Sequence, residues 1–146
     1  MRYDTIIGID PGKTGAIAAI DVRSRREPIV EELESNLLDI KDQLVGFIYL
    51  RTLVWIENAS SKEQVGFMRG VCSMHTHVDL VMVTPQLWMG RMGLMQKVGR
   101  TGQRKKPQSV KRALEIWPGI VDSDHNKAEA LLIAEAARRD CERRGL

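Results

Sequence analysis

With 146 residues, 43% of them hydrophobic, the chain is long enough for one domain with a buried core. Its two cysteines do not make a disulfide framework, and no apolar run is long enough to span a membrane. The N-terminus lacks the basic and apolar regions of a signal peptide, so we expect a cytoplasmic protein with reduced cysteines and no membrane contact.

The net charge of +3 conceals an uneven distribution. The segment from Leu80 to Leu114 has eight basic residues and no acidic ones, and subtracting these eight from +3 leaves −5 for the rest. The eight are Arg91, Lys97, Arg100, Arg104, Lys105, Lys106, Lys111 and Arg112. A polyanion is the natural partner of this basic segment, and a merely solvated surface loop is the alternative.

The first predicted strand is an apolar, β-branched run over Ile6 to Ile9 that ends in Asp10. Pro11-Gly12 then stops the strand and forces a tight turn, and Gly15 to Asp21 predicts a second strand that forms a hairpin with the first. Asp10 is therefore expected at the edge of a sheet. A carboxylate there is costly to desolvate unless water, an amide or a cation meets it.

Three other interpretations of this stretch compete with a catalytic Asp10. Asp-Pro-Gly is a common turn sequence, so a purely structural Asp10 stays open. A phosphate-binding P-loop is excluded because only three residues separate Gly8 from the Gly-Lys-Thr, where that motif needs four, and because a hairpin follows. The phosphate hairpin of actin-like ATPases needs two such domains and a much longer chain, so no nucleotide cofactor is expected.

The middle of the chain repeats the pattern found at Asp10. A third strand is predicted over Pro28 to Glu34, and a helix over Leu37 to Leu50, whose apolar residues recur at helical spacing. Leu53 to Glu57 is then a fourth strand that is apolar until its last residue. Glu57, like Asp10, is a single carboxylate at the C-terminal end of a hydrophobic strand.

A second helix is predicted after Ser60 or Ser61, either of which can cap it. Cys72 on this helix, with His75 and His77 after it, raises the alternative of a zinc site, although no fourth ligand lies nearby.

The C-terminal third is predicted to contain one strand, a loop and two helices. Leu80 to Val83 is the fifth strand, and Trp88 to Lys106, rich in Gly, Met and basic residues, is interpreted as a mobile loop. A helix follows from Pro107 to Trp117, with Leu114 among its inward-facing residues. The last helix begins near Asp124, runs towards Gly145, and has Glu129 within an apolar stretch.

This order of elements is that of a ribonuclease-H-like domain, an α/β fold with a mixed five-stranded sheet flanked by helices. In that fold the first and fourth strands are parallel neighbours, so their C-terminal ends share one edge. Adjacent strands lie about 4.8 Å apart, which would let Asp10 and Glu57 hold a cation together. A carboxylate from the final helix would complete the site.

The chain resembles the RuvC-like Holliday junction resolvases, especially the phage-encoded and chloroplast members, over nearly all of a single nuclease domain, residues 1–146. The resemblance rests on five pieces in this order: Gly8-Ile9-Asp10-Pro11-Gly12 with Gly15, Ile56-Glu57, Trp88 to Leu94 before a basic loop, Ser109 to Pro118, and Asp124 to Ala134. The last piece, which begins Asp-His-Asn-Lys-Ala-Glu-Ala, is the most distinctive.

The resemblance implies a metal-dependent endodeoxyribonuclease that acts in DNA recombination and repair. Such enzymes cut four-way DNA junctions as homodimers and leave 5′-phosphate and 3′-hydroxyl ends. Asp10, Glu57 and Glu129 match the catalytic carboxylates, which would hold two Mg²⁺ ions, with Mn²⁺ as a substitute. The basic segment would bind the DNA, and Lys106 or Lys105 would approach the reacting phosphate or only contact the backbone. A phage-encoded protein would act in the host cytoplasm.

The chain departs from the family pattern just before Glu129. Bacterial RuvC has a further acid three residues earlier, where this chain has Asn126. Asp124 or His125 would replace that acid as a metal ligand, or Asp124 would serve only as the helix cap.

Two questions about assembly and function stay open. The dimer surface is expected on the second helix, at Phe67, Met68, Val71 and Met74, unless these residues are core. The alternative functions are a ribonuclease-H-like nuclease acting on structured RNA, and a non-catalytic DNA-binding module with a degenerate metal site.

Overall fold

The structure, a computed structural model, describes residues 1–24, 26–58, 61–94 and 106–146, without the side chains of Lys106 and Pro107. Its elements are β1 (Thr5–Asp10), β2 (Ala16–Asp21), β3 (Ile29–Glu32), α1 (Leu37–Phe47), β4 (Thr52–Glu57), α2 (Lys62–Ser73), β5 (Val78–Val83), α3 (Pro85–Arg91), α4 (Lys106–Ile116) and α5 (His125–Arg144). The predicted order of strands and helices is confirmed with one addition, α3. No helix in the described ranges is both long and apolar enough to cross a bilayer.

The five strands form one mixed sheet in the order β3-β2-β1-β4-β5. β1 and β2 make the predicted antiparallel hairpin, whereas β4 runs parallel to both β1 and β5. Ile9 lies opposite Ile56, so the residues that follow them, Asp10 and Glu57, end neighbouring strands at the same edge. The expectation that the first and fourth strands share one edge is confirmed.

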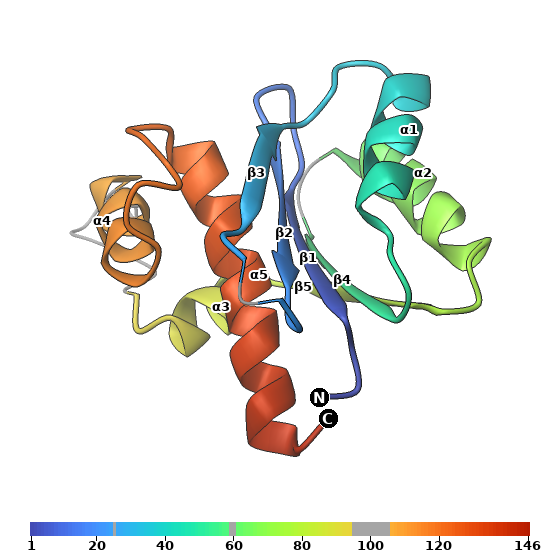
Figure 1. The fold of residues 1–146 in the computed structure, drawn as a ribbon. Coiled ribbons are helices and arrows are strands. Elements are labelled where there is room, and N and C mark those ends of the chain that lie inside the picture. Colours follow the sequence, from blue (N-terminus) through green and yellow to red (C-terminus); the bar gives the residue numbers. More distant parts are fainter. Residues whose placement is uncertain (25, 59–60, 95–105) are drawn as a thin grey trace.

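Helices cover both faces of the sheet, and Figure 1 shows α5 with α3 and α4 on one side and α1 with α2 on the other. Along β1, Ile6 packs in the α5 layer, while Ile7 and Ile9 pack against α1 and α2. Because side chains alternate along a strand, Asp10 shares the face of Ile6, and Glu57 shares the face of Trp55. Both carboxylates therefore face α5.

A glycine in β1 allows α5 to lie unusually close to the sheet. A Cβ at Gly8 would stand 2.3 Å from the carbonyl oxygen of Ala130 and 2.4 Å from the backbone nitrogen of Ala134. Helix α5 runs antiparallel to β1, with the two chain termini near each other (Figure 1). This close contact holds the N-terminal half of α5, including Glu129, towards the end of β1 that carries Asp10.

The interpretation of Trp88 to Lys106 as a loop is wrong for its first residues, because Pro85–Arg91 forms helix α3. The Thr84 hydroxyl accepts a hydrogen bond from the Leu87 N–H at 3.3 Å, and Pro85 has a backbone angle suited to the first turn. Residues 95–105 of the predicted loop lie outside the described ranges.

Two smaller predictions also needed correction. Leu114 is 39% exposed rather than turned inward, because α4 packs its Ala113 side on α5. Ser61 occupies the cap position of α2, but its side chain makes no capping hydrogen bond, and Ser60 lies outside the described ranges.

Glu135 on α5 is fully buried and accepts hydrogen bonds from Arg138 and Arg139. Burial alone would raise its pKa, but the two guanidinium groups outweigh burial and lower the pKa below the ordinary carboxyl value. A pKa that is lower in the folded than in the unfolded chain stabilises the fold above the unfolded pKa. That stabilisation is lost as pH falls through the folded pKa.

We expect Glu135→Gln to lower the free energy of unfolding at neutral pH by about 2 kcal/mol, less than for a fully buried pair because both arginines are partly exposed. In urea unfolding measured from pH 7 to pH 3, the free energy of unfolding of Glu135→Gln should fall less than that of the wild type. Glu142→Gln, an exposed partner of the same Arg138, is the matched control and should change stability by less than about 1 kcal/mol. Equal effects of the two substitutions would contradict this assignment.

Candidate active site

Three buried carboxylates come from three different elements on the α5 side of the sheet. Asp10 is 7% exposed, Glu57 6% and Glu129 6%. Asp10 and Glu57 end neighbouring parallel strands. Glu129 comes directly before Ala130, whose carbonyl faces Gly8, two residues before Asp10. The fold therefore brings the three predicted acids to one end of the β1, β4 and α5 layer.

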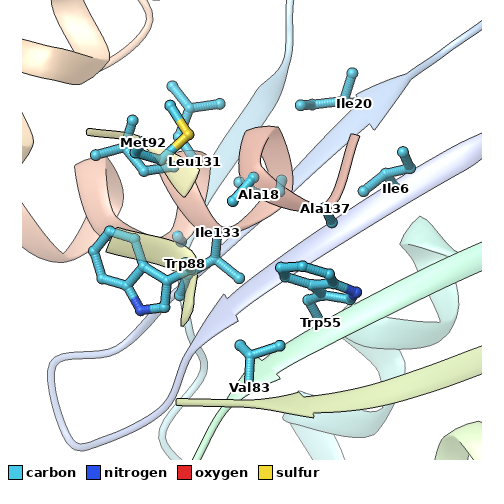
Figure 2. Packing of buried hydrophobic residues seen from close by; sticks show 14 of the residues in the cluster. Ile6, Ala18, Ile20, Trp55, Val83, Trp88, Met92, Leu131, Ile133 and Ala137 are labelled. Atoms are coloured by element: carbon cyan, nitrogen blue, oxygen red, sulfur yellow. The ribbon is translucent and has the colours of Figure 1, made fainter. Parts of the chain in front are cut away.

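Glu57 is held by a buried tryptophan. The Trp88 indole N–H donates a hydrogen bond of 2.6 Å to Oε2 of Glu57. Trp88 is fully buried, and Figure 2 shows it with Met92, Leu131 and Ile133 in the hydrophobic cluster that α5 forms with the sheet. A neutral donor satisfies one oxygen of the carboxylate and contributes no positive charge.

The turn after Asp10 is fixed from the other face of the sheet. Gly12 has a φ of 139°, which an L side chain rarely adopts, and its N–H donates to Oε1 of Gln64 on α2 at 2.8 Å. Lys13, next to it, is exposed and lines two cavities, one of about 490 Å³ beside the N-terminus of α5 and one of about 720 Å³ beside the N-termini of α1 and α2. A cationic side chain therefore stands beside the turn that follows Asp10.

Asp124 is the N-cap of α5. Its Oδ1 accepts hydrogen bonds from the N–H groups of Asn126 at 2.8 Å and Lys127 at 3.2 Å. Asp124, His125 and Asn126 also line the 490 Å³ cavity. The capping role is thus confirmed by geometry, whereas a role as metal ligand stays a prediction.

The three carboxylates offer oxygen donors of the kind that Mg²⁺ and Mn²⁺ prefer, and their burial limits competition from water. Within the described ranges, however, no group of three or more His, Cys, Asp or Glu side chains is arranged so that it could hold a metal ion. The donor chemistry fits a divalent cation, but these carboxylates are not drawn together into one coordination sphere.

The zinc alternative on the second helix is wrong. Among the described residues no group of three or more His, Cys, Asp or Glu side chains could hold a metal ion, and Cys72 is buried in the core that α1 and α2 form with the sheet, where burial raises the pKa of its thiol to about 11. The rings of His75 and His77 contact each other edge to face, with centroids 5.7 Å apart.

Only part of the basic segment can be placed. Arg91 pairs with Asp140 of α5 at 3.2 Å, and Arg112 donates to Glu115 and to the carbonyl of Met92. Lys111 is exposed. Lys97, Arg100, Arg104 and Lys105 lie outside the described ranges, as does the side chain of Lys106. To bind DNA, Arg91 and Arg112 would therefore have to keep these intramolecular contacts beside a phosphate or exchange them for it.

The strand order and the flanking helices define a ribonuclease-H-like fold. No family model and no curated protein matches the sequence. Among solved structures, the chain is similar to RuvC of Thermus thermophilus, with a TM-score of 0.57 and 17% sequence identity over 97% of this chain and 96% of that one. The predicted fold class is thereby confirmed, and the fold is that of RuvC.

Sequence reasoning missed the residues that support the carboxylates. The predicted loop includes Trp88, and the sequence pattern assigns no role to Gln64. The Thr84-Pro85 pair, a cap residue followed by proline, was the available signal for helix α3. Trp88 and Glu57 are separated by 31 positions along the chain, and Gln64 and Gly12 by 52 positions. No local sequence pattern can indicate contacts over such separations.

Substitution of Asp124 separates capping from metal binding. Asn and Ser cap helices nearly as well as Asp, so Asp124→Asn and Asp124→Ser should change stability by only a few tenths of a kcal/mol. Both remove the negative charge. If Asp124 is also a metal ligand, as we predict, the melting temperature should stay constant while metal-dependent cleavage of DNA falls steeply. Unchanged cleavage would assign Asp124 to capping alone.

Proposed function

We propose that this protein is a metal-dependent endodeoxyribonuclease that resolves four-way DNA junctions. The observation that carries the proposal is the position of Asp10, Glu57 and Glu129: two carboxylates that end adjacent parallel strands, and a third, buried on the helix that packs over them, within the fold of RuvC.

Asp10, Glu57 and Glu129 would hold the divalent cation, with Asp124 as a further oxygen donor. When bound, Mg²⁺ would supply an activated water and stabilisation of the leaving 3′ oxygen. The chain itself positions the acids: Gly8 brings α5 to the sheet, Gln64 fixes the turn after Asp10, and Trp88 orients Glu57. The ends produced would be 5′-phosphate and 3′-hydroxyl.

The basic segment from Arg91 to Arg112 would bind the DNA backbone. Lys106, the first residue of α4, would approach the reacting phosphate or only contact the DNA backbone. Lys105 precedes it. Lys13 beside the turn that follows Asp10 offers a second cation for the same backbone.

A homodimer is proposed because two opposed strands of a junction must be cut. On α2, Met68 and Val71 are buried and Phe67 is partly buried in the core of one chain, so these residues are mostly not a free surface. Met74, at the C-terminal end of α2, is 81% exposed and is the best candidate for a dimer contact.

Two observations favour a second candidate, a module that binds DNA without cutting it. Asn126 stands where bacterial RuvC has an acid, and the described residues contain no ready-made group of three metal ligands. A nuclease acting on structured RNA would use the same carboxylates.

One assay separates the three functions. The full-length protein is incubated with Mg²⁺ and end-labelled substrates of matched sequence: a four-way DNA junction, a linear duplex and an RNA hairpin. A resolvase cuts the junction in preference to the others. Preferential cutting of the hairpin would indicate the ribonuclease, and tight junction binding without any cutting would indicate the binding module.

The basic segment should bind phosphates rather than read bases. If about six of its charges meet phosphates, the logarithm of junction affinity should fall with the logarithm of salt concentration at a slope near −5. Changing Arg104, Lys105 and Lys106 together to Gln should make that slope shallower by roughly two to three and weaken binding to junctions of every sequence alike.

The measurement is a salt titration of binding in Ca²⁺, which should support binding without turnover. The matched control neutralises three exposed basic residues on α1 and α2, Lys41, Lys62 and Arg69, and should leave the slope nearly constant. An unchanged slope in the Arg104, Lys105 and Lys106 variant would indicate that the basic segment is a solvated surface loop that does not contact DNA.

A further inference from the structure

We infer that Trp88 is a positioning residue for Glu57. Its indole N–H donates to Oε2 at 2.6 Å in a buried site, which would leave the other oxygen, Oε1, for the cation that Asp10 and Glu129 would share. This inference rests on the proposed function, since it assigns a task to Trp88 only if Glu57 is a metal ligand.

The chain places Trp88 by a short, well-defined route. Glu57 lies opposite Val83 in the parallel pair of β4 and β5, and the Asn58 N–H donates to the Val83 carbonyl at 2.7 Å. Thr84 and Pro85 then start α3 immediately after β5, and this helix packs on α5. One turn into α3, Trp88 is turned into the layer between the sheet and α5, where the Glu57 carboxylate lies.

Trp88 differs from Trp117 of the same layer in having a hydrogen-bond partner for its indole N–H. Trp117 has a buried Nε1 without a hydrogen-bond partner among the described residues, so this core does not require every indole N–H to be paired. Trp55 is 4% exposed, lies two residues before Glu57 on the same face of β4, and packs with Trp88 in one cluster (Figure 2). The bond from Trp88 to Glu57 is therefore a specific feature and not a general property of buried indoles.

The chemistry of the donor matters as much as its position. Arg or Lys at this place would neutralise Glu57 and compete with a cation for it, whereas an indole N–H restricts rotation of the carboxylate and leaves its charge in place. Groups that orient metal ligands in this way commonly change metal affinity or activity by about 10–100-fold when they are removed.

The test is Trp88→Phe in the full-length protein, with Mn²⁺ alone as the probe in calorimetric titrations without DNA. We expect Mn²⁺ affinity to fall by about 10–100-fold, and the Mg²⁺ concentration needed for half-maximal junction cleavage to rise by a similar factor. Trp55→Phe, which removes the same ring from the same cluster, should leave both quantities unchanged. In a Glu57→Gln background, Trp88→Phe should weaken Mn²⁺ binding no further.

Wild-type Mn²⁺ affinity in Trp88→Phe, or an equal loss in Trp55→Phe, would overturn the inference while leaving the proposed function intact. A wild-type protein that cuts no junction and binds no Mn²⁺ would overturn both. If Trp88→Phe does not fold, the indole N–H resonance of Trp88 in the wild-type protein gives the answer. It should move on addition of Mg²⁺ and in Glu57→Gln, and its failure to move in either case would overturn the inference.

Discussion

Replacing any one of Asp10, Glu57 and Glu129 by its amide is expected to abolish junction cleavage while leaving junction binding intact. Each substitution keeps the shape of the side chain and removes a metal ligand but no phosphate contact. A loss of at least about 10²–10³-fold is expected, the scale found when one electrostatic group is removed from an active site. Junction binding should even tighten slightly, because one negative charge near the DNA is lost.

Single-turnover cleavage in Mg²⁺ and binding in Ca²⁺ measure the two quantities separately. Asp42→Asn is the matched control, because it makes the same change of charge at an exposed position on α1, on the opposite face of the sheet. Near-wild-type turnover in Asp10→Asn, Glu57→Gln or Glu129→Gln would remove that residue from the site.

Gly8→Ala is expected to damage stability and activity together. The new Cβ would meet the backbone of α5 at 2.3 Å and 2.4 Å, and backbone atoms cannot turn aside as a flexible side chain can. Helix α5 would have to move away from β1, at a cost of about 3 kcal/mol in the free energy of unfolding. Glu129 would move with it, and a displacement of about 1 Å can lower a rate by about 10²-fold.

Urea unfolding gives the stability, and cleavage is measured at a temperature where the variant remains folded. Gly46→Ala on α1 is the control, because a Cβ there meets nothing within 4 Å. It should be neutral or stabilising by up to about 1 kcal/mol. A Gly8→Ala protein as stable as the wild type would mean that the close approach of α5 to β1 does not hold Glu129 in place.

The sequence was sufficient to predict the five strands of the sheet and the acids at the C-terminal ends of the first and fourth. The runs before Asp10 and Glu57 are apolar and β-branched, and Pro-Gly marks the turn after the first of them. Parallel pairing of β1 with β4 then brings the two acids to the same edge, because the C-terminal ends of parallel strands meet there. These features depend on local patterns and on the known order of one fold.

The supporting contacts could not be predicted in the same way. Gly8 facing Ala130, Gln64 bonded to Gly12 and Trp88 bonded to Glu57 all depend on how separate elements pack in three dimensions. Helix α3 was missed for a different reason. It has only seven residues, too few for a clear helical period.

The most direct test of the central claim couples junction cleavage to ligation. A labelled four-way junction is incubated with the full-length protein and Mg²⁺, and the products are then treated with DNA ligase. We predict two nicked duplexes, cut in opposed strands, that ligase seals without further processing, and no product with Asp10→Asn. A protein that binds the junction tightly but leaves every strand uncut in both Mg²⁺ and Mn²⁺ would contradict the account and identify the chain as a DNA-binding module.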